Sequence, residues 1–133
     1  MIWQEILFEK MITKYTLANS LADSLKCTVS QIEFLNDLTL NVKAETKLLC
    51  QSYQCETQFP LRITIYILDT SLVPHNDLIT VSRICQKLNC RVLMSDKSLN
   101  PNSMLLLTPD GQTDVVSIDL DAVDETSTEI ELI

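Results

Sequence analysis

Histidine, cysteine and carboxylate side chains carry most enzyme and metal chemistry, and this chain of 133 residues supplies them unevenly. His75 is the only histidine, and it follows Pro74. A lone histidine excludes a histidine cluster for a transition metal, and no local pattern signals a nucleophile–histidine–carboxylate triad. A single glycine excludes a glycine-rich loop that cradles phosphates or dinucleotides. We therefore expect a protein that is not an enzyme and holds no cofactor, with His75 in a surface or capping role.

The cysteines give no metal-ligand spacing. The chain has five of them: Cys27, Cys50, Cys55, Cys85 and Cys90. Structural zinc sites need paired ligands separated by two to four residues, whereas both close pairs here are five positions apart. An odd number of cysteines, without a secretion signal, favours reduced thiols. We predict buried structural thiols, which behave as small hydrophobic side chains, and no metal site.

The acidic residues are the most informative group, because the net charge of −8 is confined to one part of the chain. Residues 1–97 contain ten acids and ten bases, whereas residues 98–133 contain eight acids and neither lysine nor arginine. The eight are Asp110, Asp114, Asp119, Asp121, Asp124, Glu125, Glu129 and Glu131. Such a segment makes a local negative field that attracts a basic partner. The alternative is a solvated acidic tail that only aids solubility.

Two further classes of site fit the charges poorly. The run from Asp119 to Glu125 lacks the glycine and the bidentate glutamate that a helix–loop–helix calcium loop requires. A weak cation site on Asp119 and Asp121 is less favoured than a recognition surface. Nucleic-acid binding is disfavoured, because the basic residues do not cluster and the net charge repels phosphates.

A strand over residues 60–69 is the clearest element that could position these groups. Leu61, Ile63, Ile65 and Ile67 alternate with Arg62, Thr64, Tyr66 and Leu68, the period-two pattern of a strand with one buried face. Thr16 predicts the start of a helix over 17–26, where Leu17, Leu21 and Leu25 recur every fourth residue. Asn76 or Asp77 caps a second helix, which Asn89 ends in a left-handed conformation.

Further strands are predicted over 4–13, where a helical reading also fits, and at 32–34, 44–56, 91–95, 104–107 and 115–121. The run at 104–107 predicts a strand buried on both faces, and Gly111 predicts a hairpin. Residues from about 125 add a short strand or fray. The order implies one α+β domain over 1–133, with two helices on one face of a largely antiparallel sheet. A ferredoxin-like sandwich with extra C-terminal strands is the nearest common architecture.

The chain shows no apolar run of the roughly 18 residues that would span a bilayer. Its N-terminus, from Met1 to Lys10, lacks the early basic region and cleavage site of a signal peptide. We therefore expect a soluble, cytoplasmic protein without a membrane partner.

With this acidic last strand, residues 60–125 resemble the small bacterial immunity proteins that neutralise polymorphic or contact-delivered toxins. The resemblance implies a cognate toxin, often a nuclease with a basic cleft that carboxylates block by imitating phosphates. The implied contact residues are Asp114, Asp119, Asp121, Asp124, Glu125, Glu129 and Glu131. An alternative is an adaptor or assembly subunit, including a homo-oligomer, that pairs through an exposed strand edge. An enzyme of unrecognised type, with a pocket of perturbed carboxylates, ranks third.

Overall fold

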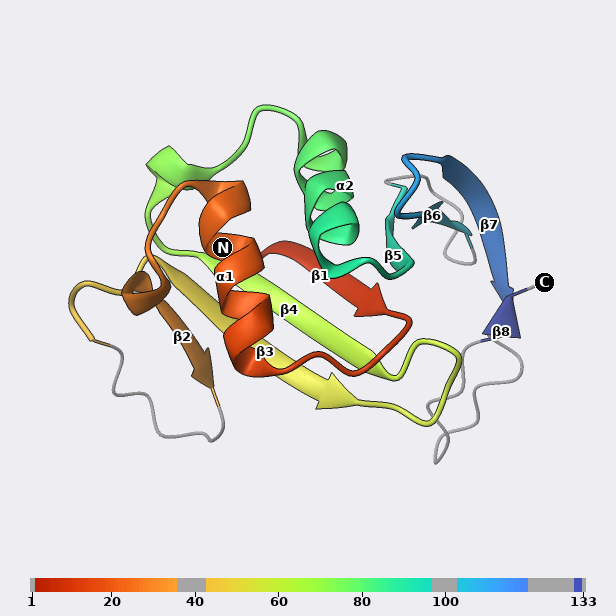
Figure 1. Cartoon of the computed structure of the whole chain (residues 1–133), viewed down its shortest axis with the longest axis horizontal. Helices are drawn as coiled ribbons and strands as arrows, with labels where there is room; N and C mark the ends of the chain where they lie inside the picture. The colour runs from red at the N-terminus through yellow and green to blue at the C-terminus, as the bar shows by residue number, and fades with distance from the viewer. Residues whose placement is uncertain (1, 36–42, 97–102, 120–130, 133) are drawn as a thin grey trace.

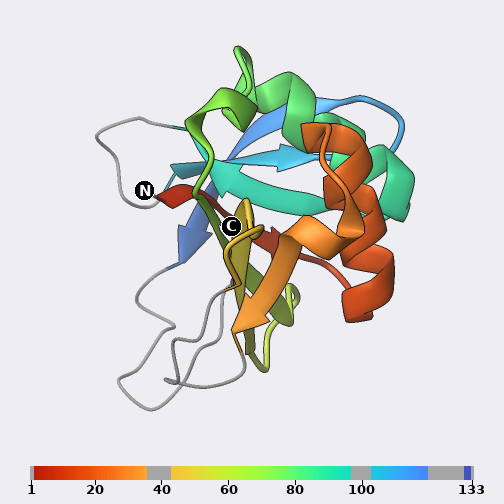
Figure 2. The ribbon, with the colours of Figure 1, turned by 90° about the vertical axis from the view of Figure 1, so that its left-hand side faces the viewer.

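The computed structural model describes residues 2–35, 43–96, 103–119 and 131–132. Over these residues the chain folds into a layer of strands with two helices on one of its faces (Figures 1 and 2). The helices are α1 (Lys14–Leu25) and α2 (Asp77–Leu88), with short 3-10 turns η1 (Val29–Gln31) and η2 (Thr70–Leu72). The strands are β1 (Ile2–Phe8), β2 (Ile32–Leu35), β3 (Leu48–Gln54), β4 (Leu61–Ile67), β5 (Val92–Ser95), β6 (Ser103–Leu107), β7 (Thr113–Asp119) and β8 (Glu131–Leu132).

The strands lie in the order β2-β3-β4-β1-β5-β6-β7-β8. Every neighbouring pair is antiparallel except β2 and β3, which run parallel at one edge. The predicted class, an α+β fold with a largely antiparallel sheet, is therefore confirmed. The finer ferredoxin-like description stays a prediction, because β2 intervenes between α1 and β3 and forms an additional edge strand.

Strand β4 lies between β3 and β1 and forms the centre of the helix-covered half. Its predicted inward side is confirmed, since Leu61, Ile63, Ile65 and Ile67 are all buried. Ile63 stands opposite Ile6 of β1, and Ile65 stands opposite Cys50 of β3. The leucines of α1 join this same core cluster, as do the buried apolar side chains of α2, which are Val81, Ile84, Cys85 and Leu88. Burial of these apolar side chains is the main force that holds the helices on the sheet.

The helix ends show how the sequence sets the boundaries. α2 agrees with the prediction, because Asn76 caps it by accepting from the Ile79 N–H at 3.1 Å and Asn89 ends it at a φ of 51°. α1 begins earlier than the predicted residue 17. Thr13, and not Thr16, is its N-cap, and the Thr13 hydroxyl oxygen accepts from the Thr16 N–H at 3.2 Å. The chain has one more competent capping residue upstream, which extends the helix by a turn.

Two predicted strands are also shorter in the structure. The strand expected over 4–13 is β1, which ends at Phe8 so that the chain can turn toward the Thr13 cap. The strand expected over 44–56 is β3, which covers only residues 48–54. Thr46 precedes it within a turn in which its N–H donates to the Lys43 carbonyl at 3.1 Å. Polar residues before the apolar start of the strand therefore form the turn.

A second, smaller cluster packs on the other face of the sheet, where β1, β5 and β6 meet. It consists of Leu7, Phe59, Leu93 and Leu106, with Met104 and Val116 half-buried against it. β6 therefore touches both clusters, through Leu107 on the helix side and Leu106 on the other. The prediction of burial on both faces holds for these two residues, whereas residues 103–105 are only half-buried.

Candidate functional site

We call the β6–β7 hairpin, β7 and β8 the acidic C-terminal edge, because they carry the described acids Asp110, Asp114, Asp119 and Glu131. Gly111 adopts a φ of 92°, as predicted for the single glycine, and its N–H donates to the Thr108 carbonyl at 3.0 Å. The Asp110 carboxylate is part of this turn, because it accepts hydrogen bonds from the Thr108 hydroxyl and, at 3.4 Å, from the Gln112 N–H. These donors lower the pKa of the Asp110 carboxyl below its usual value. Asp110 is therefore an ionised part of the turn, and its carboxylate organises the hairpin that carries β7.

Asp114 is the predicted contact residue whose side chain the structure describes. It lies exposed on β7, opposite Leu106 of β6, and its neighbour Val115 is 69 % exposed. Within the described part of the chain, Asp114 forms no ion pair with a lysine or arginine. Its charge is thus available to a partner.

Asp119 and Glu131 are brought together by the backbone. The last residues of β7 pair antiparallel with β8, and this register sets Asp119 directly opposite Glu131, with Ile118 opposite Leu132. Two acidic residues at directly opposed positions repel one another and weaken a strand pair. The sequence suggested a short terminal strand as one outcome, but it gave no register, so this juxtaposition was not predicted.

The remaining predicted contact residues lie outside the described residues: Asp121, Asp124, Glu125 and Glu129. The described strand adds one constraint to the predicted surface. Positions 114 and 119 are five apart, and positions an odd number apart in a strand alternate between its two sides. Asp114 shares its side with Val116, which packs against the smaller cluster. A partner that contacts both positions has to approach the strand from its edge.

The backbone of β7 is also accessible along one side of the strand. Residues 113–117 pair with β6 on one side, and among the described residues nothing pairs with their other side. An unpaired strand edge presents N–H and C=O groups to another chain. Val115 adds an exposed apolar side chain to this edge.

The cysteines have the predicted structural character. All five are free, and all except the half-buried Cys27 are buried. Burial raises the pKa of the Cys50 thiol to about 12, and burial also raises that of Cys85 to about 12. Cys85 further donates from its sulfur to the Cys90 carbonyl at 2.8 Å. These thiols are therefore protonated at neutral pH. The described residues contain no cluster of three or more potential metal ligands.

Sequence reasoning missed a different feature, a cavity of about 360 Å³ where the C-terminal end of α1 meets the first turn of α2. Lys26, His75 and Arg83 line it, and the lining contains no aspartate or glutamate. Arg83 is an exposed residue of α2 that also contributes to this lining. The signal in the sequence was the helical spacing of Asn76, Thr80 and Arg83, but nothing in it placed α1 beside them.

No helix in the described ranges is both long and apolar enough to cross a bilayer. A comparison of the chain with protein-family models, with curated proteins and with solved structures finds no match.

Proposed function

We propose that this chain is a non-catalytic immunity protein, which binds and neutralises a basic protein toxin through its acidic C-terminal edge. The observation that carries the proposal is the register that sets Asp119 opposite Glu131. The fold keeps two like charges at opposed positions although this weakens the strand pair. A cationic partner would relieve that repulsion when it binds. The relief would make the free energy of binding more favourable.

The surrounding charges support the same proposal. Asp114 is exposed and forms no ion pair with the described bases, and residues 98–133 contain no lysine or arginine that could neutralise the segment. By contrast, the acids Glu5, Glu9, Asp23 and Asp69 in the rest of the chain each pair with a lysine or arginine. A negative charge that no described base pairs with, as at Asp114, steers a basic partner toward this edge.

The test uses the protein encoded beside this chain, because toxins and their immunity proteins are expected from adjacent reading frames. Co-expression with the intact chain should restore the growth of cells that produce the neighbouring protein. The variant Asp119→Lys/Glu131→Lys should abolish most of this protection and slow association of the purified pair about tenfold or more at low salt. Growth is scored by colony counts and association by stopped-flow mixing.

The matched control is Glu45→Lys/Glu56→Lys, which changes the net charge equally at two exposed acids outside the C-terminal segment. This control should protect the cells as well as the parent chain. If both double variants slow association equally, only the overall charge matters and the assignment of the edge fails. If the neighbouring protein neither harms the cells nor binds the chain, the immunity function itself is rejected.

A second candidate is an assembly subunit that pairs through residues 113–117 of β7. The exposed Val115 favours it, because among the described residues this part of β7 pairs with β6 alone. Sedimentation velocity of the purified chain separates the two functions. A stable homo-oligomer that protects the 113–117 amides from hydrogen exchange supports assembly, whereas a monomer leaves the edge for another protein.

A further inference from the structure

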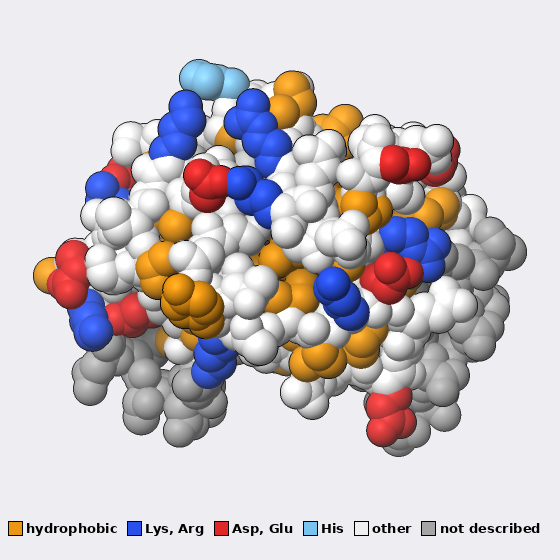
Figure 3. Space-filling model, in the orientation of Figure 1, with side chains coloured by type: hydrophobic (Ala, Val, Ile, Leu, Met, Phe, Trp, Pro, Cys, Tyr) orange, Lys and Arg blue, Asp and Glu red, His pale blue; other side chains and the backbone are white. Residues whose placement is uncertain are grey.

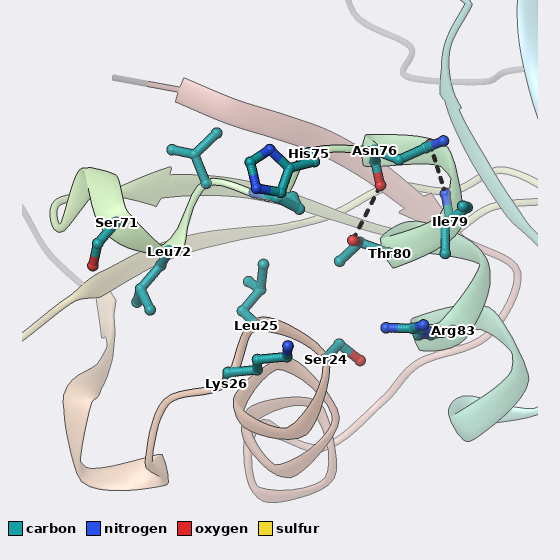
Figure 4. Close-up of a pocket in the computed structure, with 12 residues that line it drawn as sticks. Ser24, Leu25, Lys26, Ser71, Leu72, His75, Asn76, Ile79, Thr80 and Arg83 are labelled. Carbon is teal, nitrogen blue, oxygen red and sulfur yellow. Dashed lines mark hydrogen bonds between the residues drawn. The ribbon is translucent and has the colours of Figure 1, made fainter.

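The geometry points to a second binding site, of the opposite charge: a small phosphate monoester binds in the cavity between α1 and the first turn of α2. The cavity has a volume of about 360 Å³, at the small end of the range for ligand pockets. Figure 4 shows residues of both helices, and of the segment that leads into α2, facing this space. The inference is independent of the acidic edge.

The charge of the lining selects an anion. Lys26, His75 and Arg83 come from three separate segments, and no carboxylate lines the cavity, although the chain as a whole carries a charge of −8. Figure 3 shows blue side chains gathered beside the pale-blue histidine, on the face that carries both helices. Within the described part of the chain neither Lys26 nor Arg83 forms an ion pair, whereas Lys47, Arg62, Lys87 and Arg91 each pair with an acid.

The orientation of α2 adds to this positive field. A helix carries partial positive charge at its N-terminus, and the cap Asn76 lines the cavity with Ile79 and Thr80 of the first turn. Asp77, the acid of that turn, does not line the cavity, because its carboxylate accepts from Trp3 and Gln4. Asn76 caps that turn, and the Thr80 hydroxyl donates back to the Asn76 carbonyl at 3.2 Å, so the turn is held rigidly. Anions bind readily at such helix ends.

A buried hydroxyl without a partner points to a missing ligand atom. Ser24 lies in the last turn of α1, is 7 % exposed, and its Oγ forms no hydrogen bond with a described residue. Figure 4 shows this oxygen directed toward the Arg83 side of the cavity. Leaving a buried hydroxyl unsatisfied costs free energy, because the group has lost its hydrogen bonds to water. This oxygen has almost no accessible surface in the free protein, so an oxyanion beside Arg83 accepts the Ser24 hydrogen only once the side chains around it shift to admit the ligand.

The remaining lining is apolar and sets the class of ligand. Leu25, Leu72, Val73, Pro74 and Ile79 provide walls for a small organic group. Two flexible cationic side chains, a hydroxyl donor and a helix N-terminus together suit a doubly charged group with several acceptor oxygens better than a carboxylate. The ligand is therefore a phosphate monoester with a small apolar body.

Phenyl phosphate is the probe, added to the full chain at constant ionic strength while backbone amide resonances are followed by NMR. Saturable shifts should occur at residues 24–26 and 76–83, and acetate should produce much smaller ones. The variant Lys26→Gln/Arg83→Gln should raise the dissociation constant about tenfold or more. The control Lys10→Gln/Lys43→Gln removes the same charge at exposed positions outside the lining and should leave the dissociation constant unchanged.

Three results would each overturn the site. The first is that resonance shifts spread over the whole surface. The others are that both double variants lose affinity for phenyl phosphate equally, or that Lys26→Gln/Arg83→Gln binds it as tightly as the parent chain. Ser24→Ala provides a second readout, because its hydroxyl has no partner to lose in the free protein. This variant should unfold at the same or a higher urea concentration than the parent, yet bind phenyl phosphate several-fold more weakly. Undiminished affinity of Ser24→Ala contradicts the role of the hydroxyl.

Discussion

The helix-covered half of the molecule and its C-terminal edge handle charge in opposite ways. In the first, four ion pairs join Lys47 with Asp69, Arg62 with Glu5, Lys87 with Asp23 and Arg91 with Glu9. In the second, residues 98–133 hold eight acids and no base, and the register opposes two of them. Asp114, the predicted contact residue whose side chain is described, lies exposed and apart from the buried core, so it can change with little effect on stability.

The cavity between α1 and α2 sharpens this contrast. Its lining is basic within a strongly acidic chain, and it is an open hollow between the two helices and the segment that leads into α2, whereas Asp114 lies exposed on strand β7. A hollow with apolar walls suits a small ligand, and an edge with exposed carboxylates suits a protein. The two surfaces are expected to bind different partners, and each can be altered without the other.

The largest expected difference between the two regions is in stability. Leu21 is fully buried between α1 and the sheet, so Leu21→Ala should lower the free energy of unfolding by about 2–5 kcal/mol. Val115, at the edge, is 69 % exposed, and Val115→Ala should change the free energy of unfolding by less than about 0.5 kcal/mol. Urea unfolding followed by circular dichroism measures both. A comparable loss in Val115→Ala would show that the edge is part of the stabilising core.

High pH should also act on the helix-covered half. The pKa values of Cys50 and Cys85 are raised to about 12 by burial, above the ordinary thiol value of 9.0. Above pH 9 the unfolded chain loses these protons first, so the free energy of unfolding should fall between pH 9 and pH 12. Urea unfolding across this range measures the effect. Stability that stays constant up to pH 12 would contradict the raised values.

Alkylation provides the control for the thiols. At pH 8 iodoacetamide should modify the half-buried Cys27 before Cys50 and Cys85, as read by mass spectrometry of peptides. All five should react at similar rates in urea, because unfolding removes the burial that raises the pKa values.

Sequence reasoning located the elements whose pattern is local. The alternation in β4, the leucine repeat of α1 and the Asn76 and Asn89 ends of α2 depend on neighbouring residues, and each is present in the structure. The predicted burial of cysteines followed from residue type alone. The start of α1 was displaced because two threonines could cap it, and local propensity did not decide between Thr13 and Thr16.

The sites depended on contacts that the sequence does not encode locally. Asp119 was identified by its charge, but its opposition to Glu131 requires the strand register. The basic cavity requires that the end of α1, near Lys26, meets the start of α2, more than forty residues later in the chain. Capping residues predicted the two ends of α2, but not that Arg83 lines a hollow.

The smallest expected effect is the most specific for the acidic edge. Glu131→Lys places a lysine opposite Asp119, so that a repulsive pair becomes an attractive one. This should stabilise the β7–β8 pairing by about 0.2–1 kcal/mol. Glu131→Gln removes the repulsion alone and should have about half this effect. Hydrogen exchange at Ile118 and Leu132, which also oppose one another, measures the local stability.

The same substitution should weaken binding of the proposed basic toxin, because that partner would then meet a lysine where the parent chain offers a carboxylate. A variant that is more stable but binds less well would show that the repulsion between Asp119 and Glu131 is retained for binding. If Glu131→Lys lowers protection of the Ile118 and Leu132 amides, the opposed acids do not repel, and the physical argument for a cationic partner at this edge is lost. If the variant is more stable and binds equally well, the repulsion is real but the partner contacts the chain elsewhere.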